Sequence, residues 1–330
     1  MTRSVTGGFT VWLVFLKLMT RQYAGITWID ALFLFAPLVI VPLGLELTAR
    51  MEQGSVPPSL ERLARAAQLP AALCATAAFL FTPGRIAASL AAVYAAFCAV
   101  LGLAGFLRLA GGGWRRLDAA SPAVAFLSLP VAGVWLVASR MGMEPMGFHE
   151  PFVLLTAVHF HYAGFAAAML VRPVARLFAG PGKRGITAIA FRVAAIGALA
   201  GPIALAIGFL YGPRWKFYCT TVLALSETGL AIAFIAALRL VQRRSARALI
   251  ACASASVAAS MIFAVLWAYG EFHVPPVMNM TTMANFHGTM NALGFALCGL
   301  AGWALEFGDR ATSELPSRGP SAGTTLRDAA

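Results

Sequence analysis

Long apolar runs follow one another along almost the whole chain, and short segments that carry most of the charge separate them. Runs of about eighteen or more apolar residues are long enough to cross a bilayer as helices. They show no period-two alternation, which excludes a strand-built barrel and makes the expected fold class all-α, a polytopic bundle of about nine spans. The second run is short and could be partly re-entrant. The predicted spans are 27–47, 67–82, 86–107, 119–139, 150–171, 187–211, 217–240, 247–270 and 285–307.

The two ends of the chain differ from the predicted transmembrane domain at 27–307. Near the N-terminus, residues 9–19 form an apolar run that Lys17 interrupts, and the run is too short to span comfortably. Residues 1–26 are therefore expected to hold an interfacial helix. The alternative is that residues 9–20 cross the membrane. At the other end, residues 308–330 are rich in Ser, Gly, Pro and Thr, a composition that predicts a disordered cytoplasmic tail.

Composition and charge agree with a membrane protein. The chain is 60% hydrophobic and 12% charged, with a mean hydropathy of +0.78. The net charge of +12 sits in short segments between helices, as expected of cytoplasmic loops, so no nucleic-acid partner is predicted. Of the Lys and Arg residues, 17 fall in the tail and in the loops after the first, third, fifth and seventh spans, against 7 on the opposite side. This asymmetry predicts a cytoplasmic C-terminus and an external N-terminus in the bacterial cytoplasmic membrane.

Two histidines, His159 and His161, lie one residue apart inside the apolar run at 150–171. Ionisable groups at that depth are costly and usually serve a function. Residues two apart on a helix point about 200° away from each other, so both rings cannot bind one metal ion from a regular helix. One of them is expected to be the reactive group and the other a structural hydrogen-bonder. The alternative is that both are core residues bonded to neighbouring helices.

A carboxyl group, Glu227, falls near the expected bilayer centre of the span at 217–240. A carboxyl group there either pairs with a cation or stays protonated. Glu227 is therefore a candidate general acid, a proton relay or a partner of His159. A structural pair with Arg192, on the preceding span, is the alternative.

The last span carries His287 and Asn291, which are four residues apart and share one helical face. An asparagine in hydrocarbon needs partners, so this face must meet protein or water. A catalytic role and a simple interhelical hydrogen bond both remain open for Asn291. Together with His159 and Glu227, His287 could also hold a divalent metal ion.

Two segments carry a resemblance to a known family. The stretch from Glu150 to Phe165, which includes His-Phe-His-Tyr-Ala-Gly-Phe at 159–165, and the stretch from Asn285 to Phe295 resemble the YndJ-like family of bacterial membrane proteins. The resemblance runs from about Asp30 to Trp303. It implies several transmembrane helices, and it supports His159, His161, His287 and Asn291 as a site without naming a reaction.

The motifs that would identify several enzyme classes are absent from the sequence. It has no HExxH, no GxSxG and no paired aspartates of the DDxxD type. What remains favours an intramembrane enzyme that performs acid–base or metal-assisted chemistry on a lipophilic substrate, lipid or isoprenoid-like. The expected partners are therefore membrane lipids and this small molecule.

Two other functions fit the same residues. In a proton- or metal-coupled transporter they would form a relay, and Glu46 and Glu306 near the inner boundary could continue it to the cytoplasm. In a haem-anchoring sensor, two histidines from facing helices would be axial ligands. A path to the cytoplasm distinguishes the transporter from the enzyme.

Overall fold

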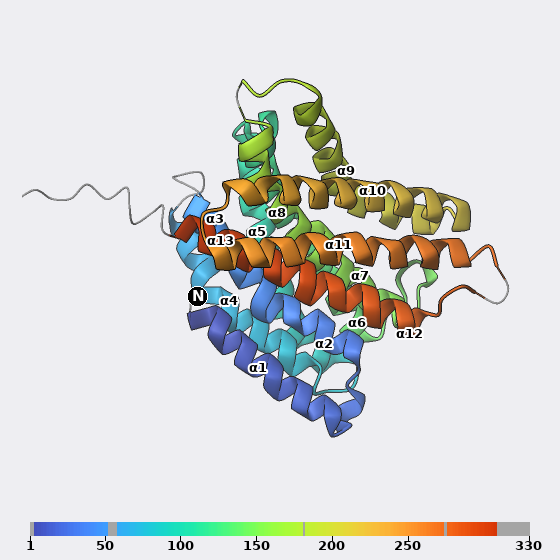
Figure 1. The fold of residues 1–330 in the computed structure, drawn as a ribbon. Coiled ribbons are helices and arrows are strands. Elements are labelled where there is room, and N and C mark those ends of the chain that lie inside the picture. The colour runs from blue at the N-terminus through green and yellow to red at the C-terminus, as the bar shows by residue number, and fades with distance from the viewer. Residues whose placement is uncertain (1–2, 52–57, 181, 274–275, 309–330) are drawn as a thin grey trace, which may run out of the picture.

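In the computed structural model, the described residues are 3–51, 58–180, 182–273 and 276–308, and all of their regular structure is helical (Figure 1). Eight helices in this part of the chain are long and apolar enough to cross a membrane. They are Trp28–Met51, Arg85–Ala110, Leu117–Met141, Phe152–Phe178, Ile186–Leu210, Pro213–Leu240, Arg244–Gly270 and Met280–Gly308. The predicted all-α polytopic bundle is confirmed.

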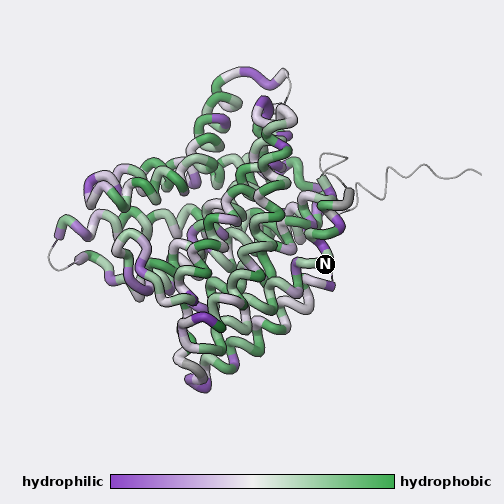
Figure 2. Tube along the Cα trace, turned by 180° about the vertical axis from the view of Figure 1, so that it is seen from behind, coloured by the Kyte–Doolittle hydropathy of each residue, from purple (hydrophilic) through white to green (hydrophobic). Residues whose placement is uncertain are grey.

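These eight helices correspond to eight of the nine predicted spans. The remaining prediction, at 67–82, falls in α4 (Pro58–Ala78), whose first half carries Arg62 and Arg65 and which is not among the eight. Hydrophobic positions fill the helices, while hydrophilic ones gather at helix ends and connections (Figure 2). Of the predicted disordered tail, residues 309–330 lie outside the described residues.

Five of the eight spans are built on one α-helix each. These are α5 (Arg85–Ala110), α6 (Leu117–Met141), α9 (Ile186–Leu210), α10 (Pro213–Ala237) and α11 (Arg244–Gly270). Short 3₁₀ turns complete the connections and the end of α10: η1 (Tyr23–Gly25), η3 (Gly113–Arg115), η4 (Pro145–Gly147) and η6 (Leu238–Leu240).

The other three spans contain π-helical segments. The first is α2 (Trp28–Phe35), η2 (Ala36–Ile40) and α3 (Val41–Met51). The second is α7 (Phe152–His159), η5 (Phe160–Ala166) and α8 (Ala167–Phe178). The third is α12 (Met280–Met283), η7 (Ala284–Gly288), η8 (Met290–Leu297) and α13 (Cys298–Gly308). A π-helical turn widens the helix by one residue and often marks a functional site.

Segments η2 and η5 lie in the interior of the bundle, whereas in η7 only Ala284 is buried. In Trp28–Met51 and Phe152–Phe178, 78% of the apolar window is buried, compared with 33% in Ile186–Leu210 and Arg244–Gly270. Segments η2, η5 and η8 also contact one another. Three irregular helices therefore meet at one place, and the outer helices shield it.

Helix α1 (Arg3–Thr20) packs beside the first span and α4 (Figure 1). The indole Nε1 of Trp12 donates to the carbonyl oxygen of Ala31 at 2.8 Å, and the buried ring of Phe15 meets Phe79 edge-on. At 1.5 Å per residue α1 is about 27 Å long, close to the roughly 30 Å of a hydrocarbon core. Helix α1 is not among the eight helices of the described chain that are long and apolar enough to cross a membrane, so the interfacial helix and the spanning helix both stay predictions.

Partly buried polar contacts fasten the end of the bundle where α3, α8 and α13 finish. The guanidinium of Arg176 donates to the carbonyl oxygen of Met51 at 2.6 Å. The carboxylate of Glu306 accepts the backbone N–H groups of Gln242 and Arg243 at 3.1 and 3.2 Å. The fourth span extends to Phe178, beyond the predicted end at 171.

Candidate functional site

His161 is held on both ring nitrogens. In segment η5, its Nδ1 lies 2.8 Å from the carbonyl oxygen of Ala157, which can only accept, so Nδ1 carries the proton. Nε2 then accepts from the hydroxyl of Tyr94 on α5, also at 2.8 Å. The ring stacks on Tyr94 and meets Phe33 edge-on at 5.3 Å. His161 is fully buried, and these contacts fix its tautomer and orientation.

His159 is in a different position, at the last residue of α7. Its Nε2 is buried and has no hydrogen-bond partner among the residues that the structure describes. The backbone of Pro202, inside α9, lies within hydrogen-bonding reach of the ring, and His287 is close enough to interact with it electrostatically. The residue as a whole is only half-buried. His159 therefore presents a ring nitrogen that is available to a ligand.

His287 and Asn291 form one unit across η7 and η8. Nδ1 of His287 donates to the carbonyl oxygen of Ser260 on α11 at 2.8 Å. The Asn291 amide nitrogen lies 3.2 Å from His287 Nε2 and 2.9 Å from the His287 carbonyl oxygen. Asn291 thus donates to a neutral imidazole whose proton is on Nδ1. The predicted shared face is present, and the amide orients the His287 ring.

The three histidines therefore differ in which of their ring nitrogens have hydrogen-bond partners. His161 and His287 each use both ring nitrogens within the protein. His159 keeps Nε2 without a partner in the described part of the chain. All three lie on the helices with π-helical segments, so the irregular centre of the bundle positions them.

Glu227 lies on the inward face of α10 and is 3% exposed. Neither carboxyl oxygen has a hydrogen-bond partner within the described residues. The neighbouring hydroxyls of Ser226 and Thr228 bond to carbonyl oxygens of their own helix instead. A buried carboxyl group of this kind is rare and is a candidate for proton transfer.

The predicted partners of Glu227 lie elsewhere. The guanidinium of Arg192, its alternative structural partner, donates to the carbonyl oxygen of Lys183 at 3.1 Å. In the described ranges no three His, Cys, Asp or Glu side chains are grouped as a metal site requires, and this includes His159, Glu227 and His287. Within its described part, the structure therefore does not bring His159, Glu227 and His287 together as one metal centre.

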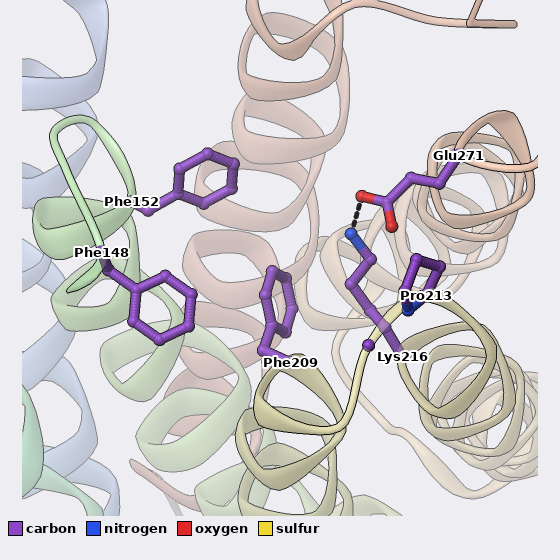
Figure 3. A pocket seen from close by; sticks show the side chains of 7 residues that line it. Phe148, Phe152, Phe209, Pro213, Lys216 and Glu271 are labelled. Carbon is purple, nitrogen blue, oxygen red and sulfur yellow. Dashed lines mark ion pairs between the residues drawn. The ribbon is translucent and has the colours of Figure 1, made fainter. Parts of the chain in front are cut away.

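Sequence reasoning did not find the residues that complete these contacts. Tyr94 is fully buried in a helix of mostly small apolar residues, and its hydroxyl is the signal that could have identified it. The carbonyl of Ser260 carries no signal in the sequence. Lys216 was counted only among the seven basic residues opposite the cytoplasmic side, yet its side chain is 8% exposed and pairs with Glu271 in a pocket (Figure 3).

The pocket is separate from His159 and has a volume of about 230 Å³. Its aromatic walls come from the start of α7 and the end of α9. Phe152 lines the pocket and lies seven residues before His159, so the two share a helical face about 10 Å apart. The lining residues are Phe148, Phe152, Phe209, Gly212, Pro213, Lys216 and Glu271.

Comparisons with known proteins agree with this membrane architecture. The family model described as YndJ-like protein matches residues 31–295. A relative described as "Uncharacterized membrane protein YndJ", from Bacillus subtilis (strain 168), is 25% identical over 193 residues. That match covers 58% of this chain and 34% of the relative, so the chain spans about a third of the relative's length. No solved structure matches the chain.

Proposed function

The chain belongs to the YndJ-like family of membrane proteins, and we propose that it is an intramembrane enzyme of the bacterial cytoplasmic membrane. It would perform acid–base chemistry at His159 on a lipophilic substrate, lipid or isoprenoid-like. One observation carries this proposal: His159 alone of the three interior histidines keeps a buried ring nitrogen without a partner among the described residues. A neutral imidazole with an available nitrogen can accept or deliver a proton.

The surrounding residues would prepare His159 for this role. Asn291 and Ser260 fix the ring of His287, which approaches His159 and would orient the substrate or complete the site. His161 would hold η5 in place through Tyr94. Glu227 would supply a second proton-transfer group from α10.

A route for a lipophilic substrate is suggested by the half-buried face of α7. Phe152, Thr156 and His159 share this face and are each incompletely covered, although the span as a whole is among the most buried. The Thr156 hydroxyl donates to the carbonyl oxygen of Phe152, so its hydrogen bond is already satisfied when a hydrocarbon chain lies against it. The substrate would follow this face from the bilayer to His159.

The alternative, a proton- or metal-coupled transporter, needs a path to the cytoplasm through Glu46 and Glu306. Both carboxyl groups are engaged: Glu46 pairs with Arg50, and Glu306 accepts two backbone N–H groups. Residues that fasten helix ends are poorly suited to hand protons on. This favours the enzyme.

The test compares lipid and pigment extracts by untargeted mass spectrometry. A strain that lacks the gene is complemented with wild type, with His159→Gln or with the matched control His273→Gln, which changes an exposed histidine. We expect a lipophilic precursor to accumulate in the deletion strain and to be cleared by wild type and by His273→Gln. His159→Gln should be slower by about 10²–10⁴-fold.

Clearance at the wild-type rate by His159→Gln would make the acid–base role of this residue wrong. Identical extracts from the deletion strain and the wild type would instead make the transporter the working hypothesis. Uptake that depends on pH and on His159 would then be the next measurement.

A further inference from the structure

The pocket at Lys216 lies where several spans end. Pro213 and Lys216 are in the first turn of α10, Gly212 lies in its connection to α9, and Glu271 directly follows α11. Phe152 begins α7, and Phe148 lies in the connection before it. The lining residues therefore come from three connections at one end of the spans, the level at which lipid head groups meet a membrane protein.

A cation is buried in this pocket among aromatic rings. The Lys216 ammonium forms an ion pair with Glu271 (Figure 3), and its Nζ lies 4.8 Å from the ring centroid of Phe209 and 4.3 Å from that of Trp267. Both distances are within the range of cation–π attraction. Glu271 is the more exposed partner, at 30% against 8% for Lys216. The ammonium is therefore more enclosed than the carboxylate with which it pairs.

The remaining walls are hydrocarbon-like. Phe209 contacts Phe148 at 6.5 Å and Phe152 at 6.4 Å between ring centroids, and it stacks on Trp267 at 6.2 Å. The cavity of about 230 Å³ is smaller than the roughly 300–1,000 Å³ of pockets that enclose drug-sized ligands. It has room for a head group or a chain end, with the rest of the molecule left in the bilayer.

From this arrangement we propose that the pocket binds the head group of a zwitterionic amphiphile that carries both a phosphate and an ammonium group. The head group takes the place of the direct Lys216–Glu271 contact: its phosphate pairs with Lys216, and its ammonium pairs with Glu271 beside the aromatic rings. A singly charged head group would leave one member of the buried pair without its partner, which is costly. The hydrocarbon chains of the ligand lie against Phe148 and Phe152.

This proposal does not depend on the chemistry proposed at His159, because lipid binding to the pocket is measured without any reaction. Full-length protein is reconstituted in vesicles of equal parts phosphatidylethanolamine and phosphatidylglycerol and is then extracted in detergent. Native mass spectrometry counts the lipids that remain bound. The variants are Lys216→Gln, Glu271→Gln and the control Arg214→Gln, which removes an exposed charge from the same turn of α10.

Wild type and Arg214→Gln are expected to retain phosphatidylethanolamine in preference to phosphatidylglycerol by about tenfold or more, and Lys216→Gln to lose that preference. Glu271→Gln leaves an uncompensated ammonium in the pocket, so its preference should reverse toward the anionic lipid. The Glu271→Gln variant therefore still tests the proposal if Lys216→Gln does not fold. Equal retention of both lipids by wild type, or an unchanged preference in Glu271→Gln, would overturn the proposal.

Discussion

The hydroxyl of Tyr94 and Nε2 of His161 lie 2.8 Å apart, at a point where both side chains are completely buried. The bond joins α5 to the π-helical segment η5, and the two rings also stack, with 5.8 Å between centroids. Since Nδ1 is committed to Ala157, the tyrosine is the donor that Nε2 uses. The Ala157 carbonyl therefore sets the tautomer, and Tyr94 satisfies the remaining ring nitrogen of a histidine two residues from the proposed catalytic group.

Replacing Tyr94 by phenylalanine removes only this donor. We expect Tyr94→Phe to lower the free energy of unfolding by about 1–3 kcal/mol, because Nε2 of His161 would stay buried without its partner. Thermal unfolding in detergent measures the loss. Tyr218→Phe is the control, because that ring is 59% exposed, and it should be neutral. Equal stability of the two variants would show that the Tyr94–His161 bond contributes little.

A second prediction separates function from stability at His159. His159→Leu removes a buried nitrogen that has no partner in the described residues, so the melting temperature should stay level or rise while product formation is lost. His287→Leu should instead lower the melting temperature, because the carbonyl of Ser260 and the amide of Asn291 lose their partner. A large loss of stability in His159→Leu would point to a structural role for that ring.

Glu227→Gln supplies a third prediction. The amide has nearly the same shape as the carboxyl group but cannot exchange a proton in catalysis. Because the structure gives neither carboxyl oxygen a partner in its described part, the variant should fold and unfold like wild type. We expect product formation in the extract assay to be lost. Normal product formation with normal expression would remove Glu227 from the mechanism.

The spans were predictable because each depends on one property, the length of an apolar run. The π-helical segments were not, since the extra residue in a turn leaves no mark on an unbroken hydrophobic run. The opposite orientations predicted for His159 and His161 agree with their different partners, but the widened turn that begins at Phe160 had no signal.

The candidate site was predictable as residue types and less so as contacts. His287 and Asn291 were expected to share a face, and they do, because residues four apart in the sequence lie on the same side of this helix. Whether Glu227 pairs with Arg192 depends on which helix faces meet, and sequence periodicity does not determine this. In the structure Arg192 donates to the carbonyl oxygen of Lys183 instead. The buried Lys216–Glu271 pair had no signal in the sequence, because burial at a helix end depends on neighbouring connections.

The last prediction concerns the docking of α1 on the first span. Gly8 faces the backbone of Leu38 in η2 so closely that an added Cβ would collide with its carbonyl oxygen. On the adjacent position, a Cβ at Gly7 would meet only the Leu69 side chain, at 4.0 Å. Gly8→Val should therefore force α1 away from η2 and destabilise the protein by about 1–3 kcal/mol, whereas Gly7→Val should be tolerated.

Two measurements test the effect of Gly8→Val and the placement of α1. Thermal unfolding in detergent reports the stability, and labelling of a Ser4→Cys thiol in sealed vesicles reports the side of the membrane on which the helix begins. A helix packed along the first span as a transmembrane element exposes that thiol on the cytoplasmic side, and an interfacial helix exposes it outside. If Gly8→Val and Gly7→Val unfold alike, close packing on η2 does not hold α1 in place. Selective damage by Gly8→Val together with cytoplasmic labelling would establish α1 as part of the transmembrane bundle, with the N-terminus inside.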